Sequence, residues 1–241
     1  MKIRLTEHQT KEIWRHADAV CFDVDSTVVT GEGLDEFAAF CGRGAEVAEW
    51  TIKAMSGGVS FRTALEERLK IISPTLKQVL FYVPKLDIKL ENFIKKSSLH
   101  LTAHIRDVIS TLMERGTEVY LVSGGFRSII EPIAEDLKIP KENIFANTIL
   151  FDDKGMYNGF DLNEPTSDSG GKAKVIELLK QKHNYHRHVM IGDGATDMEA
   201  CPPADAFIGF GGNVVRQKVK ENASWFVMDF KILLNELQSI S

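Results

Sequence analysis

Asp23 and Asp25, which follow a short apolar run, are the residues whose type and spacing most clearly suggest chemistry. In an extended chain side chains alternate, so these two carboxylates should point to the same side. Paired carboxylates at the end of a buried strand repel each other and need a positive partner. Mg2+ meets that need, since it typically binds one or two carboxylates together with water and a phosphate. The alternative is a helix N-cap at Asp25 or Ser26, and the pair alone does not decide between the two.

Two glycine-containing segments carry groups that suit an anion. Ser123 is followed by Gly124 and Gly125 after an apolar run, and free backbone N–H groups at the start of a helix attract anions. Lys172 follows a pair of glycines at the start of a helical pattern, where a cation is unfavourable against the helix dipole. That position therefore suggests a binding role for Lys172, whereas Lys174 is expected to be a solvated helix charge.

Asp193 and Asp197 lie four residues apart, after another apolar run. If a helix begins near Asp193, the two carboxylates share one of its faces. Asp193 is then placed to bind a metal, and Asp197 to order Lys172 or bound water. Capping of the helix remains an alternative for either residue.

Continuous apolar runs before these groups predict strands buried on both faces, as in a parallel sheet. The expected strands are 19–25, 117–122, 188–191, 205–210 and 225–228, and the expected helices of this part are 101–115, 127–137, 172–182, 214–221 and 230–237. Such alternation specifies an α/β fold with a doubly wound parallel sheet. Ligands bind beyond the carboxyl ends of its strands, where the acidic pair, Ser123 and Asp193 are expected. A β-hairpin is predicted at 147–161.

Residues 32–100 interrupt the alternation and predict an inserted helical cap, with 1–31 and 101–241 forming the catalytic core. The expected cap helices are 32–40, 45–55, 61–71 and 75–97. An insertion that directly follows the acidic strand end should cover the site as a lid. The apolar stretch 81–84 is expected to be exposed, which suggests a homodimer contact.

Composition excludes several classes of protein. The 241 residues are 44% hydrophobic and 26% charged, as in globular proteins, and the net charge of −5 offers no footprint for nucleic acid or an anionic membrane. Cys21, Cys41 and Cys201 are too widely spaced for a disulfide framework or a zinc site. No apolar run approaches the ~20 residues that span a bilayer. We therefore expect a cytoplasmic protein.

The histidines 183, 186 and 188 resemble a metal site in their spacing, but a surface turn is the favoured interpretation.

Taken in order, these segments resemble the four motifs of the haloacid dehalogenase superfamily. The matching residues are Asp23-Val24-Asp25-Ser26-Thr27, Ser123, Lys172, and Gly192-Asp193-Gly194 with Asp197. The residues Ala54-Met55-Ser56-Gly57, Phe61, Arg68 and Gly209-Phe210-Gly211-Gly212-Asn213 are similar to the members of that superfamily that act on phosphoserine. The resemblance runs from about Asp18 to the carboxyl-terminal helix.

The resemblance implies Mg2+-dependent cleavage of O-phospho-L-serine to L-serine and phosphate, the final step of L-serine biosynthesis. Asp23 would attack phosphorus and form an aspartyl phosphate. Asp25 would protonate the leaving serine alkoxide, which is too basic to leave otherwise, and then accept a proton from water. The implied metal ligands are Asp23, Asp193 and the backbone carbonyl of Asp25.

The resemblance further implies that Glu32 pairs with the ammonium of the substrate and Arg68 with its carboxylate. The other implied substrate-binding residues are Met55, Gly57, Phe61, Ser123, Gly124, Gly125, Lys172 and Thr196. Met55 and Phe61 would exclude water as the cap closes. From the residues alone, ordinary core packing is the favoured interpretation for Met55 and Phe61, and a solvated helix charge for Arg68.

Two alternative functions remain open on the sequence. One is a phosphatase of the same superfamily that acts on another small phosphate ester. The other is a phospho-acceptor signalling domain, which also places an aspartate beside acids and a lysine on a parallel sheet. Asp25 and the cap argue against the signalling domain, because both serve turnover.

Overall fold

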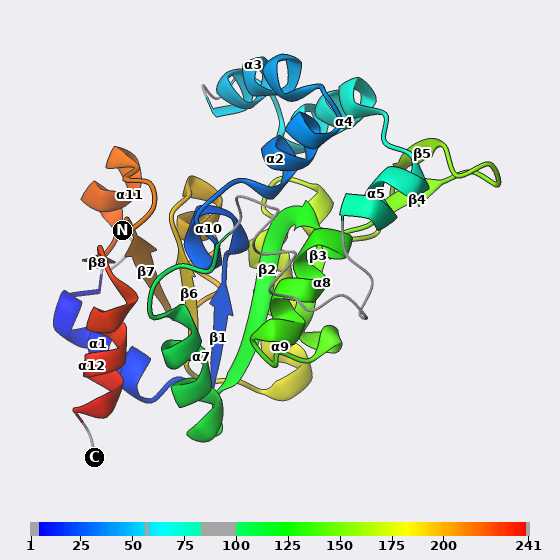
Figure 1. Ribbon diagram of the computed structural model, residues 1–241. Coiled ribbons are helices and arrows are strands. Elements are labelled where there is room, and N and C mark those ends of the chain that lie inside the picture. The colour runs from blue at the N-terminus through cyan, green and yellow to red at the C-terminus, as the bar shows by residue number, and fades with distance from the viewer. Residues whose placement is uncertain (1–4, 56–57, 83–99, 240–241) are drawn as a thin grey trace.

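A six-stranded parallel sheet forms the centre of the protein, as expected, in a computed structural model that describes residues 5–55, 58–82 and 100–239 (Figure 1). The strands are β1 (Ala19–Phe22), β2 (Glu118–Phe126), β3 (Ile144–Asn147), β6 (His188–Gly192), β7 (Ala206–Phe210) and β8 (Trp225–Val227). Their order across the sheet is β3-β2-β1-β6-β7-β8. The order reverses on either side of β1, so Asp23 at its end lies at the switch point where doubly wound sheets bind ligands.

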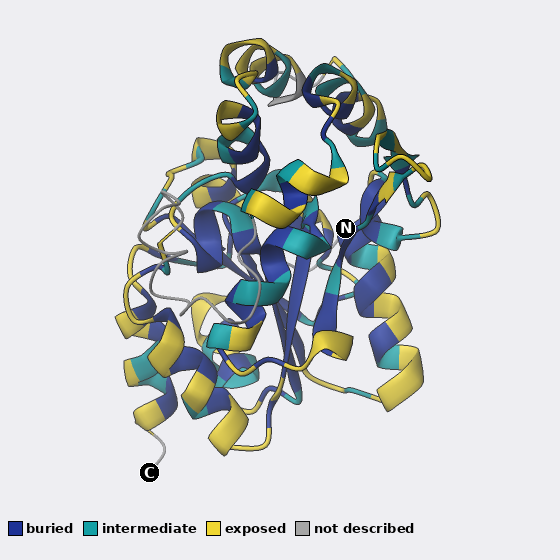
Figure 2. Cartoon of the chain, turned by 45° about the vertical axis from the view of Figure 1, so that its right-hand side comes forward, coloured by how far each residue is buried: buried dark blue, intermediate teal, exposed yellow. Residues whose placement is uncertain are grey.

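Helices cover both faces of the sheet. One face packs against α1 (Glu7–Arg15), α7 (Ile105–Glu114), α8 (Arg127–Asp136) and α12 (Phe230–Gln238), and the other against α9 (Gly171–His183), α10 (Ala195–Glu199) and α11 (Gln217–Asn222). Side-chain alternation along β1 explains the two layers, since Val20 and Phe22 enter the first and Ala19 and Cys21 the second. Figure 2 shows the strands buried in the middle and the exposed residues on the outer helix surfaces.

Four helices beyond the carboxyl ends of the strands come from the interruption after β1 (Figure 1). They are α2 (Gly33–Phe40), α3 (Gly44–Met55), α4 (Phe61–Ile72) and α5 (Leu76–Tyr82). The two connections to the core lie side by side, because Val29 and Leu101 form an antiparallel bridge and Thr102 N donates to Val28 O at 2.9 Å. The fourth helix begins near its expected start, and residues 83–97 of the predicted range lie outside the described residues.

The region around Asn147 differs from the prediction. The predicted hairpin exists as β4 (Ile149–Phe151) and β5 (Tyr157–Phe160), but Asn147 belongs to β3, a core strand that was not predicted. Pairing of Phe126 with Asn147 extends β2 beyond Val122 after a shift of register. Ser123, Gly124 and Gly125 therefore lie in an irregular strand end rather than in a turn.

The amino-terminal helix α1 was also not predicted. A capping box starts it, since Gln9 N donates to Thr6 Oγ1 at 3.2 Å and Thr6 N donates to Gln9 Oε1 at 2.9 Å. Trp14 fixes the helix to the core through an indole bond of 3.1 Å to Leu233 O. The Thr-x-x-Gln pattern is a sequence signal that would have located this helix.

His188 is wrongly placed by the surface-turn interpretation, although His183 and His186 are exposed as expected. It begins β6 and is fully buried, with its Nε2 3.1 Å from the Sγ of Cys21. No described group bonds to its Nδ1. Burial, assisted by the charge of Lys180, lowers the pKa of His188 to about 4. The side chain is therefore neutral at neutral pH.

We expect this histidine to reduce stability in mild acid. Between its unfolded pKa near 6.5 and its folded pKa near 4, the unfolded chain binds the proton and the folded chain does not, so stability falls as the pH falls. Between pH 7 and pH 5 the free energy of unfolding, measured in urea, should fall by roughly 1–2 kcal/mol less for His188→Val than for wild type. His186→Val, at an exposed position, is the control. Identical pH slopes for wild type and His188→Val would contradict this assignment.

Candidate active site

The backbone turns sharply after β1, and the turn separates the roles of the two aspartates. Asp23 follows the strand directly, and Asp25 lies in the irregular helical turn η1 (Val24–Val28), where Ser26 adopts a left-handed φ of 54°. Asp25 Oδ1 accepts from Gly33 N at 2.7 Å, at the first residue of α2. Asp25 therefore contacts the start of the first cap helix, as the N-cap alternative anticipated in part.

Lys172 joins two of the predicted acids. Its Nζ lies 2.6 Å from Asp23 Oδ1 and 2.5 Å from Asp197 Oδ1, and all three residues are buried. Burial opposes the charged form, but the carboxylates of Asp197 and Asp23 outweigh it and raise the pKa of Lys172. Asp197 Oδ2 also accepts from Gly194 N at 2.9 Å. The ordering of Lys172 and the capping of α10 are therefore both roles of Asp197.

The carboxylate oxygens of Asp23, Asp193 and Asp197 lie within 4.8 Å of one another, and all three residues are buried. Burial, followed by the charge of Asp197, raises the pKa of Asp23 well above its ordinary value, and burial also raises that of Asp197. Among the described residues, the side-chain cations bonded to this cluster are Lys172 and Arg216, two for three carboxylates. The donor set therefore fits a hard divalent cation with oxygen ligands.

Sequence reasoning missed Arg216 and the site role of Thr27. Arg216 Nε donates to Asp193 Oδ2 at 2.6 Å, and its NH2 group lies 3.4 Å from Glu32 Oε1. Thr27 Oγ1 donates to Asp193 Oδ1 at 3.3 Å. Arg216 is the N-cap residue of α11, where a cation is unfavourable against the dipole. The argument that identified Lys172 would also have found this arginine.

Glu32, the N-cap residue of α2, lies at the border between cap and core. Its Oε1 accepts from Ser26 Oγ at 2.9 Å, in addition to the contact with Arg216. Burial and the charge of Asp25 raise the pKa of Glu32 to about 7. An additional cation nearby, such as an ammonium group, would stabilise the charged form of this carboxyl group.

Helix α4 brings two predicted residues to the site. The ring of Phe61 lies against Gly124, where an added Cβ would be 2.5 Å from Cζ of the ring. Seven residues along the helix, Arg68 is half-buried and its Nε donates to Ala64 O at 3.1 Å. Burial lowers the pKa of Arg68, and the charges of Asp35, Glu32 and Asp25 oppose that effect. Arg68 is thus half-buried rather than fully solvated, and the nearby carboxylates favour its charged form.

Ser123 and Gly125 form a small hydrogen-bonded unit beside Asp25. Gly125 N donates to Ser123 Oγ at 2.8 Å, and that hydroxyl lies 3.5 Å from Asp25 Oδ2. A side chain at Gly125 would be tightly placed, because an added Cβ would lie 3.1 Å from both Asp25 Oδ2 and Ser123 Oγ.

Three predicted substrate-binding residues remain, and the structure describes the side chain of one of them. Thr196 is exposed in the first turn of α10. Met55 is the last residue of α3, but its side chain and Gly57 lie outside the described residues.

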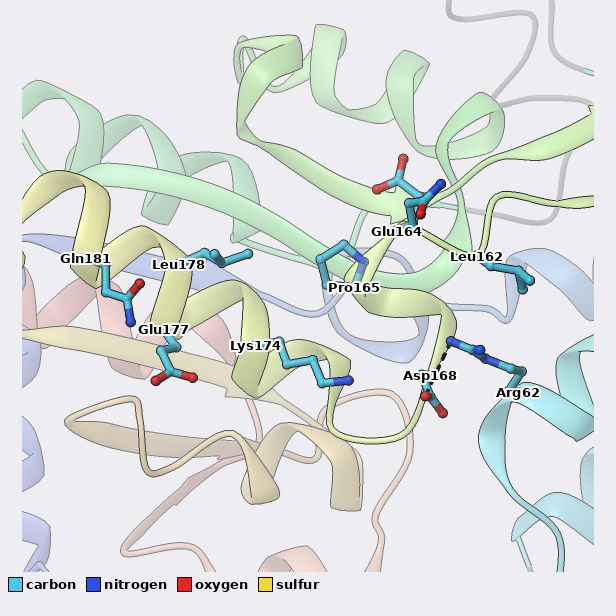
Figure 3. A pocket seen from close by; sticks show the side chains of 10 residues that line it. Arg62, Leu162, Glu164, Pro165, Asp168, Lys174, Glu177, Leu178 and Gln181 are labelled. Atoms are coloured by element: carbon cyan, nitrogen blue, oxygen red, sulfur yellow. Dashed lines mark ion pairs between the residues drawn. The ribbon is translucent and has the colours of Figure 1, made fainter.

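A cavity of about 470 Å³ is lined by none of the predicted site residues (Figure 3). Its lining residues are Arg62, Leu162, Asn163, Glu164, Pro165, Asp168, Lys174, Glu177, Leu178 and Gln181. The Arg62–Asp168 ion pair of 3.3 Å crosses it and joins α4 to the loop before α9. Charges of both signs line this open space, and no reacting group faces it.

An acidic cluster at the carboxyl end of β1 and a set of helices inserted after that strand are the main features of the site. Residues 17–205 match the haloacid dehalogenase-like hydrolase family, and the chain belongs to that family. Among the described residues, no helix has the length and apolar character needed to cross a membrane.

Within this class the chain is similar to phosphoserine phosphatases. It is 52% identical to that of Homo sapiens over 234 residues, which are 97% of this chain and 99% of the human one. A solved phospho-aspartyl intermediate analogue of a phosphoserine phosphatase superposes with a TM-score of 0.73 at 27% identity, over 91% of this chain and 98% of that one. The structure of DsGPDH of Dunaliella salina gives a TM-score of 0.79 at 36% identity, with 95% of this chain covering 37% of that longer one.

Proposed function

We propose that the protein hydrolyses O-phospho-L-serine to L-serine and phosphate, the final step of L-serine biosynthesis. The proposal rests mainly on two aspartates after β1. Asp23 is paired with Lys172, and Asp25 lies beside Ser123. Glu32, at the start of the proposed cap, lies close enough to Asp25 for the charge of Asp25 to raise its pKa. The similarity to the human phosphoserine phosphatase supports the choice of substrate.

In this mechanism a carboxylate oxygen of Asp23 attacks phosphorus, and the bond from phosphorus to the serine oxygen breaks. Asp25 donates a proton to the departing serine oxygen. Water then attacks the aspartyl phosphate, Asp25 takes a proton from that water, and phosphate leaves with Asp23 restored. Ser123, the amide of Gly124 and Lys172 hold the phosphoryl oxygens and stabilise their charge, and Gly125 N orients Ser123 Oγ.

The carboxylates of Asp23 and Asp193 and the backbone carbonyl of Asp25 would hold Mg2+. When bound, the ion offsets the repulsion between the phosphate dianion and the carboxylates. Arg216 and Thr27 position Asp193 through its two oxygens, and Asp197 holds Lys172 against Asp23. Residues that orient ligands in this way commonly affect metal affinity strongly.

Recognition of the amino acid part of the substrate falls to the cap. Glu32 binds the ammonium group and Arg68 the carboxylate, while Phe61 and Met55 exclude water over the phosphate. Gly57 and Thr196 complete the proposed substrate contacts.

The cap corresponds to residues 32–100 and the core to 1–31 and 101–241 in our proposal. The adjoining connections at Val29 and Leu101 support this division, because they let the insertion leave and re-enter the core at one place. We further propose a cytoplasmic homodimer, with the exposed Phe81 close to the contact.

The decisive experiment for the function is initial-rate hydrolysis of a panel of phosphate esters, with and without Mg2+. We expect O-phospho-L-serine to be the best substrate and EDTA to abolish its turnover. If phosphoserine is poor and another small ester is cleaved well, the alternative phosphatase is correct. Release of about one equivalent of phosphate followed by arrest would instead identify a signalling domain.

Arg68→Ala is expected to lower kcat/KM for phosphoserine by roughly 100-fold, which corresponds to the loss of one charge-assisted bidentate contact of about 3 kcal/mol. Cleavage of p-nitrophenyl phosphate should change little, because that ester has no carboxylate. Lys70→Ala removes an exposed cation from the same helix and serves as the control. Equal losses on both substrates would remove Arg68 from substrate recognition.

A further inference from the structure

A buried amide at the end of β3 makes contacts that the proposed mechanism does not yet use. Asn147 is fully buried, and its Nδ2 donates to Gly124 O at 2.8 Å. Its Oδ1 accepts from Thr166 Oγ1 at 3.0 Å, and its Nδ2 also lies 3.4 Å from Thr166 O. Both ends of this side chain are thus occupied by backbone or side-chain partners, which fixes its orientation.

The bond to Gly124 O begins a chain of hydrogen bonds that ends at the proposed acid. The carbonyl of Gly124 belongs to the same peptide group as Gly125 N, which donates to Ser123 Oγ at 2.8 Å. The Ser123 hydroxyl in turn faces Asp25 Oδ2 at 3.5 Å. Because Oγ already accepts from Gly125, its own proton remains available for a phosphoryl oxygen or for Asp25. Fixing the Gly124 carbonyl therefore fixes the direction in which Ser123 donates.

The contact with Thr166 connects the same amide to the lysine of the site. Thr166 lies in the short helix η3 (Pro165–Ser167), which packs closely against the start of α9. A Cβ added to Gly171 would lie 2.1 Å from Pro165 O, so the backbones touch there. Lys172 is the next residue and reaches Asp23 from this point. Asn147 thus lies between the two segments that hold phosphoryl oxygens in the proposed mechanism.

We infer that Asn147, held by Thr166, is a positioning residue that sets the orientation of the Ser123-Gly124-Gly125 strand end relative to Lys172 for binding of the transferring phosphoryl group. The inference rests on the proposed phosphatase function but not on the identity of the leaving alcohol. Its effect should therefore be the same for every phosphate ester that the protein cleaves, in contrast to that of Arg68.

Asn147→Leu is the direct test, because leucine has a similar size and cannot donate to Gly124 O. We expect kcat to fall by about 10- to 100-fold for both phosphoserine and p-nitrophenyl phosphate, with a smaller change in KM. Inhibition by orthovanadate, which mimics the pentacoordinate phosphorus, should weaken by a similar factor. If wild type cleaves only the aryl ester, the proposed substrate is wrong, and Asn147 can still be tested on that ester.

Asn143→Leu is the matched control. Asn143 is also buried and its Nδ2 donates to a carbonyl of β2, that of Val119 at 3.0 Å, but at the opposite end of the strand. We expect this variant to lose a comparable amount of thermal stability while its kcat stays within about twofold of wild type. A folded Asn147→Leu variant with equally unchanged kcat and orthovanadate inhibition would overturn the inference.

A second pair of variants covers the case in which Asn147→Leu does not fold. Thr166→Val removes the hydroxyl that holds Asn147 Oδ1, and Thr166→Ser keeps it. We expect a loss of about 3- to 10-fold in kcat for the valine variant and near-normal kcat for the serine variant. Equal kcat values for these two variants would also overturn the inference.

Discussion

Asp23→Asn is expected to lower kcat by about four orders of magnitude or more, with the chain still folded. An amide oxygen is a poor nucleophile and cannot form the aspartyl phosphate, so the covalent step is lost. Stability measured in EDTA should be unchanged or higher than that of wild type. The reason is that Asp23 is buried within 4.8 Å of the carboxylates of Asp193 and Asp197, and the substitution removes one of these like charges.

Steady-state hydrolysis of phosphoserine, together with urea unfolding in EDTA, measures both effects. Asp152→Asn is the control, because Asp152 is an exposed residue of the β4–β5 hairpin that accepts from Lys154 N and Met156 N. A near-normal rate for Asp23→Asn would refute the covalent mechanism.

Lys172→Met is expected to reduce activity strongly and, unlike Asp23→Asn, also to destabilise the protein. The ammonium group bonds to Asp23 and Asp197 at 2.6 and 2.5 Å in a buried site. Removing one partner from a buried ion pair leaves the other charge uncompensated, which typically costs about 3–5 kcal/mol. The phosphoryl group also loses its cationic ligand, so we expect kcat to fall by roughly 100- to 1,000-fold.

Lys174→Met is the matched control, since Lys174 lies on the same helix with its side chain exposed toward the cavity of Figure 3. We expect that variant to have near-normal kcat and an unfolding free energy within about 0.5 kcal/mol of wild type. The prediction for Lys172→Met is wrong if the two methionine variants are equally stable in EDTA.

The double variant Asp23→Asn/Lys172→Met separates two contributions of Lys172 to stability, its charge and the packing of its alkyl chain. Because the neutral amide removes one of the carboxylates that Lys172 compensates, the double variant should be more stable than Lys172→Met alone. A double-mutant cycle in urea gives this coupling directly, and residues in one network typically couple by about 0.5–3 kcal/mol. Strictly additive losses would show that the lysine acts mainly through the packing of its alkyl chain.

Local pattern in the sequence was enough to predict five of the six strands of the sheet, most of the helices around them and several of the polar groups at the strand ends. A strand buried on both faces must be apolar throughout, and polar residues that follow such strands lie at the same edge of a parallel sheet. Asp23, Ser123 and Asp193 could be assigned to one site for that reason, and Lys172 because a cation is unfavourable at the start of a helix. The two interpretations left open for Asp197 were both correct, because one carboxylate has an oxygen for Lys172 and another for Gly194 N.

Tertiary structure alone decided the contacts between groups that are far apart along the chain. Arg216 contacts both Asp193 and Glu32, the latter 184 residues away along the chain, and Asn147 reaches Gly124 because β3 pairs with the extended end of β2. His188, part of a pattern typical of a surface turn, is buried against Cys21 by the pairing of β1 with β6. Strand pairing is non-local, and each residue's neighbours across the sheet depend on the register. The acids of the site and Lys172 were therefore evident in the sequence, whereas Arg216 and Asn147, which reach their partners through tertiary contacts, were not.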